Sequence, residues 1–344
     1  MKPESRLKLQ NILAIIGIAL FFGLSYNFFF YPHTLNEFIE AGTISIFLGL
    51  IVGILEEFVL KRLFHKISSL FVTIIRAFLY SLIISIILCL VLSIEISFDQ
   101  QITYLEAVSQ YLYSALFIRD FLFSLTFIII MVFISQVMQL TGKLNFLKLM
   151  LGLYHRPREV SRIFMFLDIK DSTAIAEKLD NKLYSELIRD FFYDISEAII
   201  MFNGEIYQYA GDEIIVTWPL KGDNVNCIRT FFKMKEIIKK KRKTYSKKYN
   251  LIPEFKAGIH CGQVMVTTVG RQKKEIAYHG DVLNTTARIE GKCNVLGQKL
   301  LVSKNMLPFV KNNKKFILKE KGEIELKGKA EKLSLYGVQQ NLLK

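Results

Sequence analysis

Two aspartates at the ends of predicted strands are the residues best suited to do chemistry in this sequence. Asp168 ends the apolar run "SRIFMFLDI", which is typical of a buried strand. Asp212 lies between "GEIYQY" and "IIVTW", two strand-like runs separated by a break that contains Gly211, and this pattern predicts a β-hairpin. Carboxylates at the ends of neighbouring strands could bracket divalent cations, because hard cations that bind phosphate take one or two carboxylates each. An Asp beside a Gly is also common turn chemistry.

Residues next to the two aspartates receive different predictions. Glu213 follows Asp212 directly, so strand alternation predicts that its side chain points to the opposite face and does not bind the cations. After Asp168, the segment "KDST" begins a predicted helix. Asp171, Ser172 and Thr173 there are either helix caps only or part of a loop whose backbone N–H groups face phosphates.

A second pair of polar residues lies in "GDVLNTTARIEGKCN". Asn284 and Arg288 are spaced i, i+4 and therefore share one face of a helix. An amide beside a guanidinium suits a nucleotide, because the first can bind a sugar or base and the second a phosphate charge. A helix surface would also tolerate this pair with no function. Further on, Lys327 in "ELKGK" is either a surface lysine or a phosphate anchor.

Taken in order, the segments "FLDIKDST", "GEIYQYAGDE", "GDVLNTTAR" and "ELKGK" resemble the catalytic domain of class III adenylate and guanylate cyclases. The resemblance covers residues 161–338, more than half of the chain. It implies an α+β, ferredoxin-like βαββαβ domain that pairs head to tail as a homodimer. It also implies an enzyme, a nucleotide cyclase that converts a nucleoside triphosphate into a 3′,5′-cyclic nucleotide and pyrophosphate, for use in intracellular signalling.

The same resemblance assigns roles to single residues. Asp168 and Asp212 would hold two Mg²⁺ or Mn²⁺ ions, with the carbonyl of Ile169 assisting. Asn284 would position the ribose, Arg288 would stabilise the transition state, and Lys327 would bind the terminal phosphates. The ions would lower the pKa of the attacking hydroxyl and neutralise phosphate charge.

The sequence departs from the family where the purine base is bound. Gln208 stands where the family has a lysine, and Ala277 stands where it has an acidic residue or threonine. A Gln amide carries both a donor and an acceptor and can therefore suit adenine or guanine, whereas Ala277 offers neither. We expect an adenylate cyclase, with a guanylate cyclase or a non-catalytic, nucleotide-responsive module as alternatives. A diguanylate cyclase is a rival on the "AGDEI" turn alone, since the "NTTAR" and "ELKGK" segments belong to the class III pattern.

The N-terminal part of the chain predicts a membrane region. The 344 residues are 51% hydrophobic and carry a net charge of +14, which suggests a membrane part joined to a basic cytosolic part. Apolar stretches of roughly the 20-residue length that a bilayer requires occur at 9–30, 44–60, 67–94 and 117–140. No small-residue cleavage site follows the first stretch, so we expect a retained helix. A receptor or carrier with a regulatory cytosolic domain is a further alternative, although no internal repeat favours a transporter.

The distribution of lysine and arginine predicts the orientation of the four spans. Lysines and arginines occur within 2–8, 61–66 and 143–158, whereas "YPHTLNEFIEAG" and "SFDQQITYLEAVSQY" contain none. Both termini should therefore lie in the cytosol, as in a multi-pass protein of the inner cell membrane. Glu56 and Glu57 should reach water near the inner end of the second span or pair with Lys61, while Arg76 snorkels toward the same face.

These predictions divide the chain into three parts. A membrane domain covers 1–141, an amphipathic helical linker covers 142–159 and stops near Pro157, and the catalytic domain covers 160–344. The basic run at 233–248 holds a single aromatic residue, which disfavours nucleic acid and favours a solvated helix end or attraction to membrane lipid. The four cysteines include no CxxC pair, and a reducing compartment suits the soluble half.

Overall fold

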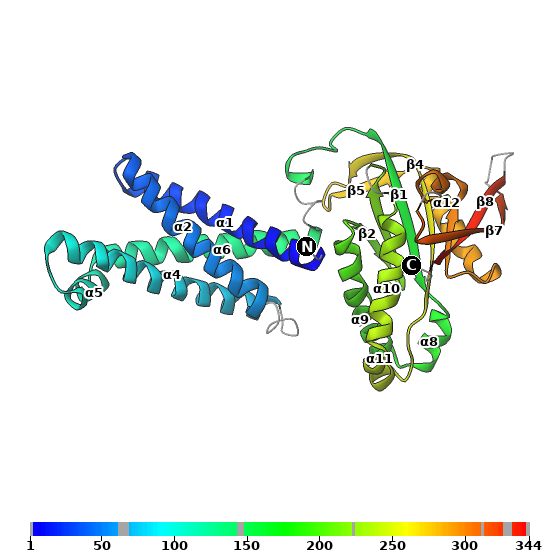
Figure 1. The fold of residues 1–344 in the computed structure, drawn as a ribbon, viewed down its shortest axis with the longest axis horizontal. Coiled ribbons are helices and arrows are strands. Elements are labelled where there is room, and N and C mark those ends of the chain that lie inside the picture. Colours follow the sequence, from blue (N-terminus) through cyan, green and yellow to red (C-terminus); the bar gives the residue numbers. More distant parts are fainter. Residues whose placement is uncertain are drawn as a thin grey trace. The chain divides into compact units, whose positions relative to one another are not determined.

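The chain forms two compact units, Met1–Thr141 and Gly142–Lys344 (Figure 1). This computed structural model describes residues 3–60, 69–142, 148–221, 224–310, 313–325 and 332–341. Lys327, Lys61 and most of the "GKLNFL" start of the predicted linker lie outside the described residues.

The first unit is entirely helical in its described part. Its helices are α1 (Pro3–Phe30), α2 (Leu35–Leu55) with a π-helical end (Glu56–Leu60), α4 (Ser69–Gln100), α5 (Tyr104–Leu112) and α6 (Ala115–Thr141). Four segments are long and apolar enough to cross a bilayer: Asn11–Phe30, Leu35–Val59, Ile74–Gln100 and Ala115–Ile134. The predicted number of spans is therefore confirmed by length and composition, although the second begins earlier than the sequence pattern indicated.

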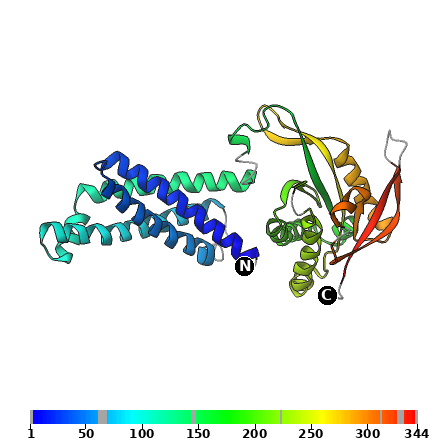
Figure 2. The ribbon, with the colours of Figure 1, turned by 45° about the horizontal axis from the view of Figure 1, so that its top comes forward.

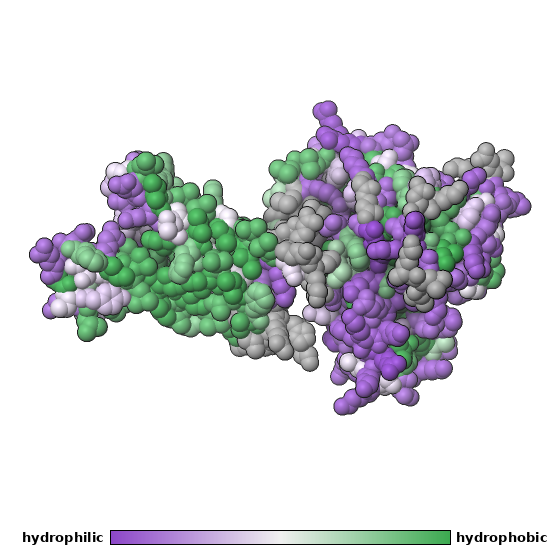
Figure 3. Space-filling view, viewed as in Figure 1, coloured by the Kyte–Doolittle hydropathy of each residue, from purple (hydrophilic) through white to green (hydrophobic). Residues whose placement is uncertain are grey.

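Apolar side chains cover the outside of this unit, and polar ones gather inside it. Phe21, Phe29 and Phe133 are each at least 65% exposed, while Asn27 and Asp120 are buried. Figure 3 shows the corresponding apolar surface over the helices of the first unit and a predominantly hydrophilic surface over the second. This inverted arrangement is what a helical bundle adopts when lipid is its solvent.

The acidic residues at the end of the second span find partners within the bundle. Glu56 forms an ion pair with Arg76 at 3.1 Å and accepts a hydrogen bond from the Tyr80 hydroxyl. Glu57 accepts a hydrogen bond from Asn11 at 2.8 Å. Arg76 thus pairs with Glu56 at the end of the second span, the face toward which it was expected to reach.

The second unit is built on one sheet covered by helices. Its strands are β1 (Arg158–Ile169), β2 (Glu205–Ala210), β3 (Glu213–Pro219), β4 (Phe255–Val269), β5 (Glu275–His279), β6 (Leu300–Ser303), β7 (Phe316–Glu325) and β8 (Lys332–Gln340). The strand order is β2-β3-β1-β4-β6-β8-β7, and β5 pairs with β4. The antiparallel group β2-β3-β1-β4, with helices after β1 and after β3, is the ferredoxin-like βαββαβ arrangement that the family resemblance implied.

The main hydrophobic core lies on one face of this sheet. Alternate residues of β1, including Ile163, Met165 and Leu167, point to this face and are fully buried. They pack against two helices that Figure 1 shows side by side, α9 (Asn181–Met201) and α10 (Asn226–Lys240). Two shorter helices adjoin them in the chain: α8 (Ser172–Lys178) precedes α9, and α11 (Arg242–Tyr249) follows α10.

The opposite face is covered in part by α12 (Asp281–Val295), which packs on β4 (Figure 2). Gly258 of β4 permits this close approach, because a Cβ atom there would lie 2.4 Å from the backbone nitrogen of Glu290. The short elements that complete the unit are a 3-10 turn (Lys304–Met306) and α13 (Leu307–Val310). The opposite face also carries the small cluster of Phe164, Phe166, Ile215 and Tyr278.

Two further sequence predictions concern the segments around this core. The linker was predicted to be helical as far as Pro157, but its described part has only a short helical stretch at 148–150 and then turns, with Gly152 at a φ of 60°. Leu149 and Tyr154 pack against the small cluster, so tertiary contacts outweigh the helical pattern. In the basic run, Lys248 pairs with Glu186 and Asp190, which fits a solvated helix end held by local ion pairs.

Candidate active site

The candidate site lies where β1 ends, between the two neighbouring strands. Asp168 is the penultimate residue of β1 and is paired with Glu213 of β3 on one side and Lys256 of β4 on the other. Residues directly opposite in a sheet share a face, so the three charged side chains form one row across β3, β1 and β4. This is the face on which α12 lies. Asp168 follows Phe164 and Phe166 along this face of β1, because alternate residues of a strand point to the same side.

Asp212 joins this row from the β2–β3 turn. Gly211 adopts a φ of 64°, a left-handed conformation that lets the hairpin turn tightly, and Asp212 follows it. Burial, a hydrogen bond shared with Asp212 and the charge of Asp212 together raise the pKa of Asp168 to about 6. The structure thus brings the two aspartates that the sequence singled out into direct contact.

Lys256 and Glu290 extend the cluster toward α12. The Lys256 amine lies 3.2 Å from Asp168 and 2.7 Å from Glu290. Burial opposes its charge, but the two carboxylates prevail and raise the pKa of Lys256. The cluster thus includes four carboxyl groups, those of Asp168, Asp212, Glu213 and Glu290. Among the described residues, Lys256 is the one cation within it.

The prediction that Glu213 points away from this cluster was wrong. Its carboxyl group lies close enough to Glu290, Asp168 and Asp212 that burial and their charges raise its pKa to about 7. One of its oxygens is buried without a hydrogen-bond partner. Strand alternation failed because Asp212 lies in the turn and is not on the strand, so the two neighbours need not point to opposite faces.

The sequence analysis also missed three neighbours of the aspartates. Lys256 and Glu290 carried no motif signal, since only the β1–β4 register and the approach of α12 at Gly258 bring them in. Tyr184 of α9 is close as well: burial and the charges of Asp212 and Asp168 raise the pKa of its phenol.

The donor set at the strand end fits divalent cations that bring other ligands with them. Within the described ranges, no three His, Cys, Asp or Glu side chains form a complete metal cage. Mg²⁺ commonly binds through one or two carboxylates and completes its shell with water and substrate phosphates. Two adjoining carboxylates, one with a raised pKa, match that requirement, because a cation would offset their mutual repulsion.

The second predicted pair lies on the outer side of α12. The helix buries Val282, Thr286 and Ile289, while Asn284 is exposed and Arg288 is half-buried. The Arg288 guanidinium donates to the backbone carbonyl of Glu325, the last residue of β7, at 3.4 Å. Lys327 lies outside the described residues.

The remaining predicted residues do not converge on the aspartates in the same way. Gln208 is exposed on β2, in the row of Ile215 and Phe166, whereas Ala277 of β5 pairs with Thr267 of β4. Ala277 therefore points to the other side of β5 from its neighbour Tyr278.

The residues after Asp168 divide between the core and the following loop. The Ile169 side chain is buried in the main core. Ser172 and Thr173 begin α8, whose N-cap, Asp171, makes no side-chain capping hydrogen bond. The structure thus does not support capping by Asp171 as the reason for the "KDST" sequence.

Comparison with known proteins agrees with this geometry. A family model described as "Adenylate and Guanylate cyclase catalytic domain" matches residues 155–340. "Adenylate cyclase 2" of Rhizobium meliloti is 32% identical over 206 residues, which are 59% of this chain and 57% of that protein. "Adenylate cyclase" of Anabaena cylindrica is 27% identical over 183 residues, 51% of this chain and 36% of that protein. The matched part of the chain thus spans 57% and 36% of the length of these two relatives.

The fold has a counterpart among solved structures. A structure titled as a bacterial light-regulated adenylyl cyclase matches with a TM-score of 0.52 at 21% identity, covering 61% of this chain and 63% of that one. This likeness concerns the fold alone. Since the family model covers more than half of the chain, from just before β1 to the end of β8, this protein belongs to the adenylate and guanylate cyclase catalytic-domain family.

Proposed function

We propose that this chain is a membrane-anchored purine nucleotide cyclase that converts ATP into 3′,5′-cyclic AMP and pyrophosphate. The observation that carries the proposal is the contact between Asp168 and Asp212 at the strand end, inside a domain of the cyclase family. ATP is favoured over GTP because the similar curated proteins are named adenylate cyclases.

The reaction needs positioning and charge compensation more than covalent help from the protein. The ribose 3′-oxygen attacks the α-phosphorus, a new P–O bond forms, the proton leaves the hydroxyl and pyrophosphate departs. Divalent cations, when bound, acidify that hydroxyl and neutralise phosphate charge. Asp168 and Asp212 would hold them, with the Ile169 carbonyl assisting, and the backbone at Ser172 and Thr173 would face the phosphates.

The residues on α12 would act on the nucleotide itself. Asn284 would orient the ribose, so that its 3′-oxygen is in line with the departing pyrophosphate. Arg288 would bind the charge that develops on the phosphate in flight, and Lys327 would hold the terminal phosphates. These roles follow the match of each position to the family motif.

We further propose that two copies share each site. The charged neighbours of Asp168 among the described residues are Asp212, Glu213, Lys256 and Glu290, while Asn284 is exposed on α12. A head-to-tail homodimer would bring the aspartates of one copy to Asn284 and Arg288 of the other, giving two sites per dimer. A shared site explains why α12 carries Asn284 exposed and Arg288 half-buried, away from the aspartates of its own chain.

The choice between ATP and GTP depends on residues other than a charged base-reading pair. Gln208 can donate and accept and is exposed, so it can suit either purine. A guanylate cyclase is therefore the second candidate. A non-catalytic nucleotide-responsive module is the third, favoured only by Gln208 and Ala277, since Asp168, Asp212 and Arg288 are all present.

The deciding experiment is an assay of the full chain in membranes or detergent. The chain is incubated with Mn²⁺ and either ATP or GTP, and cyclic product and pyrophosphate are followed together. We expect cyclic AMP and pyrophosphate in equal amounts, and little cyclic GMP. Cyclic GMP as the main product would establish the second candidate, and nucleotide binding without any cyclic product would establish the third.

The membrane location is part of the same proposal. We propose that both termini and the cyclase domain face the cytosol across the inner membrane, because basic residues flank the predicted inner loops. Reporter fusions after Lys143 and within the "LNEFIE" loop test this. They should report opposite sides of the membrane, and the same side for both would refute the topology.

A further inference from the structure

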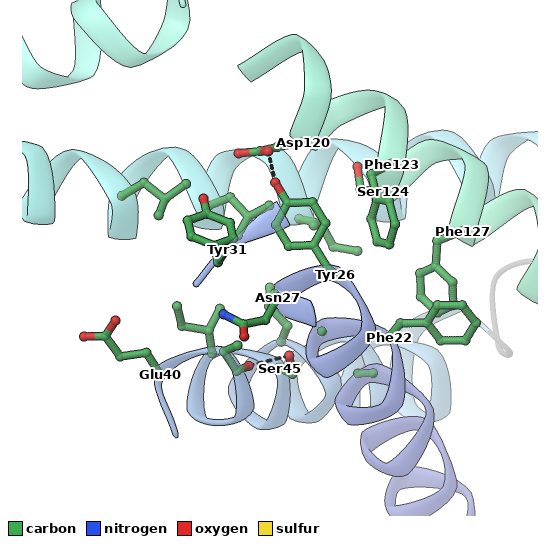
Figure 4. A pocket seen from close by; sticks show the side chains of 18 of the residues that line it. Phe22, Tyr26, Asn27, Tyr31, Glu40, Ser45, Asp120, Phe123, Ser124 and Phe127 are labelled. Atoms are coloured by element: carbon green, nitrogen blue, oxygen red, sulfur yellow. Dashed lines mark hydrogen bonds between the residues drawn. The ribbon is translucent and has the colours of Figure 1, made fainter. Parts of the chain in front are cut away.

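The membrane unit contains a pocket between α1, α2, α4 and α6. Its volume is about 180 Å³. Aromatic side chains form much of its wall, with Phe22, Tyr26 and Tyr31 from α1 and the turn after it, and Phe123 and Phe127 from α6 (Figure 4). A pocket with an apolar body and a few polar groups is the usual form of a small-molecule site.

The charged residues of this pocket are all acidic. Its lining includes Glu37, Glu40, Glu95 and Asp120, and the lining residues include no Lys, Arg or His. The two loops predicted to lie outside the membrane near it also lack Lys and Arg. An acidic pocket on a chain with a net charge of +14 is a local feature that composition does not explain.

Asp120 is already compensated by its neighbours. It is 4% exposed, pairs with Arg119 at 3.0 Å and accepts hydrogen bonds from the hydroxyls of Tyr111, at 2.9 Å, and Tyr26. Arg119 also lies over the Tyr31 ring. This group fixes the aromatic wall and leaves no charge on Asp120 for a ligand to neutralise.

The three glutamates differ from Asp120 in this respect. Within the described ranges, no ion pair joins Glu37, Glu40 or Glu95 to a basic side chain. The charges recorded around Glu95 are those of Glu40, Asp99 and Glu37, all of the same sign. Like charges that line one cavity favour a cation between them.

Asn27 supplies a second, independent sign of a ligand. Its side chain lines the pocket, and the residue is only 4% exposed. Its amide nitrogen donates to the Glu37 carbonyl at 3.3 Å, which fixes the orientation of the amide. The amide oxygen is buried without a hydrogen-bond partner. A buried acceptor is costly when left unpaired, so the pocket lacks a hydrogen-bond donor at this point.

We propose that this pocket binds a small organic ammonium ion with an aromatic or aliphatic body. The ammonium group would donate to the Asn27 amide oxygen and neutralise the glutamates, and the body would lie against the Tyr26, Phe123 and Phe127 side chains. Aromatic faces also attract cations directly. The predicted topology places the pocket toward the outer side of the membrane, where such an ion would arrive without crossing the bilayer.

Two other occupants fit the pocket less well. A bare divalent cation needs several oxygen ligands close together, and no group of three acidic, His or Cys side chains among the described residues is so arranged. A lipid acyl chain would fill the apolar part but would leave the Asn27 oxygen unpaired and the glutamates uncompensated. An organic ammonium ion would fill the apolar part of the pocket, donate to the Asn27 oxygen and neutralise the glutamates.

Calorimetric titration of the full chain in lipid nanodiscs tests the proposal with two matched probes. Tryptamine carries an ammonium group, and tryptophol has the same indole body with a neutral hydroxyl in its place. We expect one tryptamine per chain, and at least about tenfold weaker binding of tryptophol. Glu40→Gln and Glu95→Gln should each weaken tryptamine roughly tenfold, because each removes one nearby charge.

The controls distinguish specific binding of tryptamine from its partitioning into the lipid and from misfolding of a variant. Glu106→Gln removes an acidic group of the same predicted side outside the pocket, and its capping box tolerates Gln, so tryptamine affinity should not change. Asn27→Leu should weaken tryptamine, but Glu40 is exposed and its variant keeps the test valid if Asn27→Leu fails to fold. Equal binding of the two probes, unchanged affinity in both glutamate variants, or displacement of tryptamine by Mg²⁺ alone would each overturn the proposal.

Discussion

The two halves of the proposed cyclase site are organised in opposite ways. At the end of β1, Asp168 and Asp212 are pressed together beside Glu213, with burial raising the pKa of Asp168. On α12, Asn284 is exposed, and the one contact described for the half-buried Arg288 is with the backbone carbonyl of Glu325 at the end of β7. The first half has too much negative charge for its surroundings, and the second has polar groups with little to bind.

This difference indicates what each half lacks. Crowded carboxylates are stabilised by cations, so the strand-end half should respond to metal and to pH. Polar groups on an exposed helix face gain from a docked partner, so the α12 half should respond to dimerisation and substrate. The predictions below test whether the two halves are parts of one shared site.

The largest effect is expected at the carboxylate half. Asp168→Ala or Asp212→Ala should each lower kcat by about 10²-fold or more, because each removes charge that holds the cations. The fold should persist, since both side chains lie at the sheet end and outside the cores. Asp171→Ala is the matched control: it is exposed in the adjoining loop, makes no capping hydrogen bond and should leave activity nearly unchanged. Near-normal activity of either strand-end variant with Mg²⁺ would show that the two-metal assignment is wrong.

Mixing variants tests most directly whether the two halves belong to one site shared between two copies. Asp212→Ala and Arg288→Ala should each be nearly inactive alone, yet a mixed dimer would have one site with both lesions and one with neither. Random pairing of equal amounts makes half of the dimers mixed, so co-expression should restore about a quarter of wild-type activity. Activity is measured in membranes, where anchoring confines both copies to one plane.

The control for this experiment is a mixture of two lesions in the same half. Asp168→Ala mixed with Asp212→Ala should recover nothing, because both lesions affect the same site of each protomer. Sites completed within one chain would recover nothing in either mixture. Recovery in the first mixture alone is therefore specific to sharing between the halves.

A smaller effect is expected from pH. Burial and Asp212 raise the pKa of Asp168 from 3.8 to about 6, so the folded chain holds this proton more tightly than the unfolded chain does. The ionised form is the one that binds a cation. Activity should therefore rise with pH through about 6, and at pH 5 about a tenth of Asp168 is ionised.

Varying the metal concentration shows whether protonation of Asp168 or a general loss of structure lowers the activity at low pH. Because proton and cation compete for the same carboxylate, raising Mn²⁺ at pH 5 should recover much of the lost activity. The raised pKa also means that Asp168 destabilises the metal-free chain as pH rises from about 4 to 6, and Asp168→Asn should remove that dependence. The measurement is kcat/KM against pH at two Mn²⁺ concentrations, and a profile that ignores Mn²⁺ would contradict the assignment.

Much of the architecture could be predicted from the sequence. The spans follow from the length of apolar stretches, and the β2–β3 hairpin follows from strand-like runs around Gly211. Asp168 and Asp212 could be paired because both end strands of one motif. These features are local, and their signals lie within a few residues of one another.

The features that were missed depend on contacts between distant segments. Lys256 reaches Asp168 only through the β1–β4 register, and Glu290 only because Gly258 lets α12 approach β4. Glu213 was misassigned because turn geometry overrode strand alternation. In the membrane unit, Arg119 and Asp120 lie within an apolar pattern, and only the packing of α1 on α6 reveals that Tyr26 contacts Asp120.

The smallest effect on activity is expected from Glu205, which joins the linker to the sheet behind the site. Its carboxylate lies 2.8 Å from Lys148 and 2.9 Å from Arg162, and all three side chains are at most 15% exposed. Burial alone would raise its pKa, but these two cations outweigh burial and lower it. Glu205 therefore stabilises the folded chain above its unfolded pKa, near the reference value of 4.5, and this contribution is lost as pH falls further.

Glu205→Gln should consequently lower the stability of the cyclase unit by about 2–3 kcal/mol at pH 7, because it leaves the Arg162 charge buried without its carboxylate. The loss should shrink as pH falls below 4.5, because Glu205 of the unfolded wild-type chain takes up its proton there and Glu205 of the folded chain at a lower pH still. Fluorescence of Trp218, the sole tryptophan, reports unfolding of this unit from its buried place on β3. Glu236→Gln, at an exposed ion pair on α10, is the control and should change stability by less than about 0.5 kcal/mol. Equal losses of stability in both variants would mean that the linker contact adds nothing beyond an ordinary surface ion pair. A larger loss for Glu205→Gln with kcat unchanged would show that Glu205 stabilises the fold around the site and takes no part in the reaction.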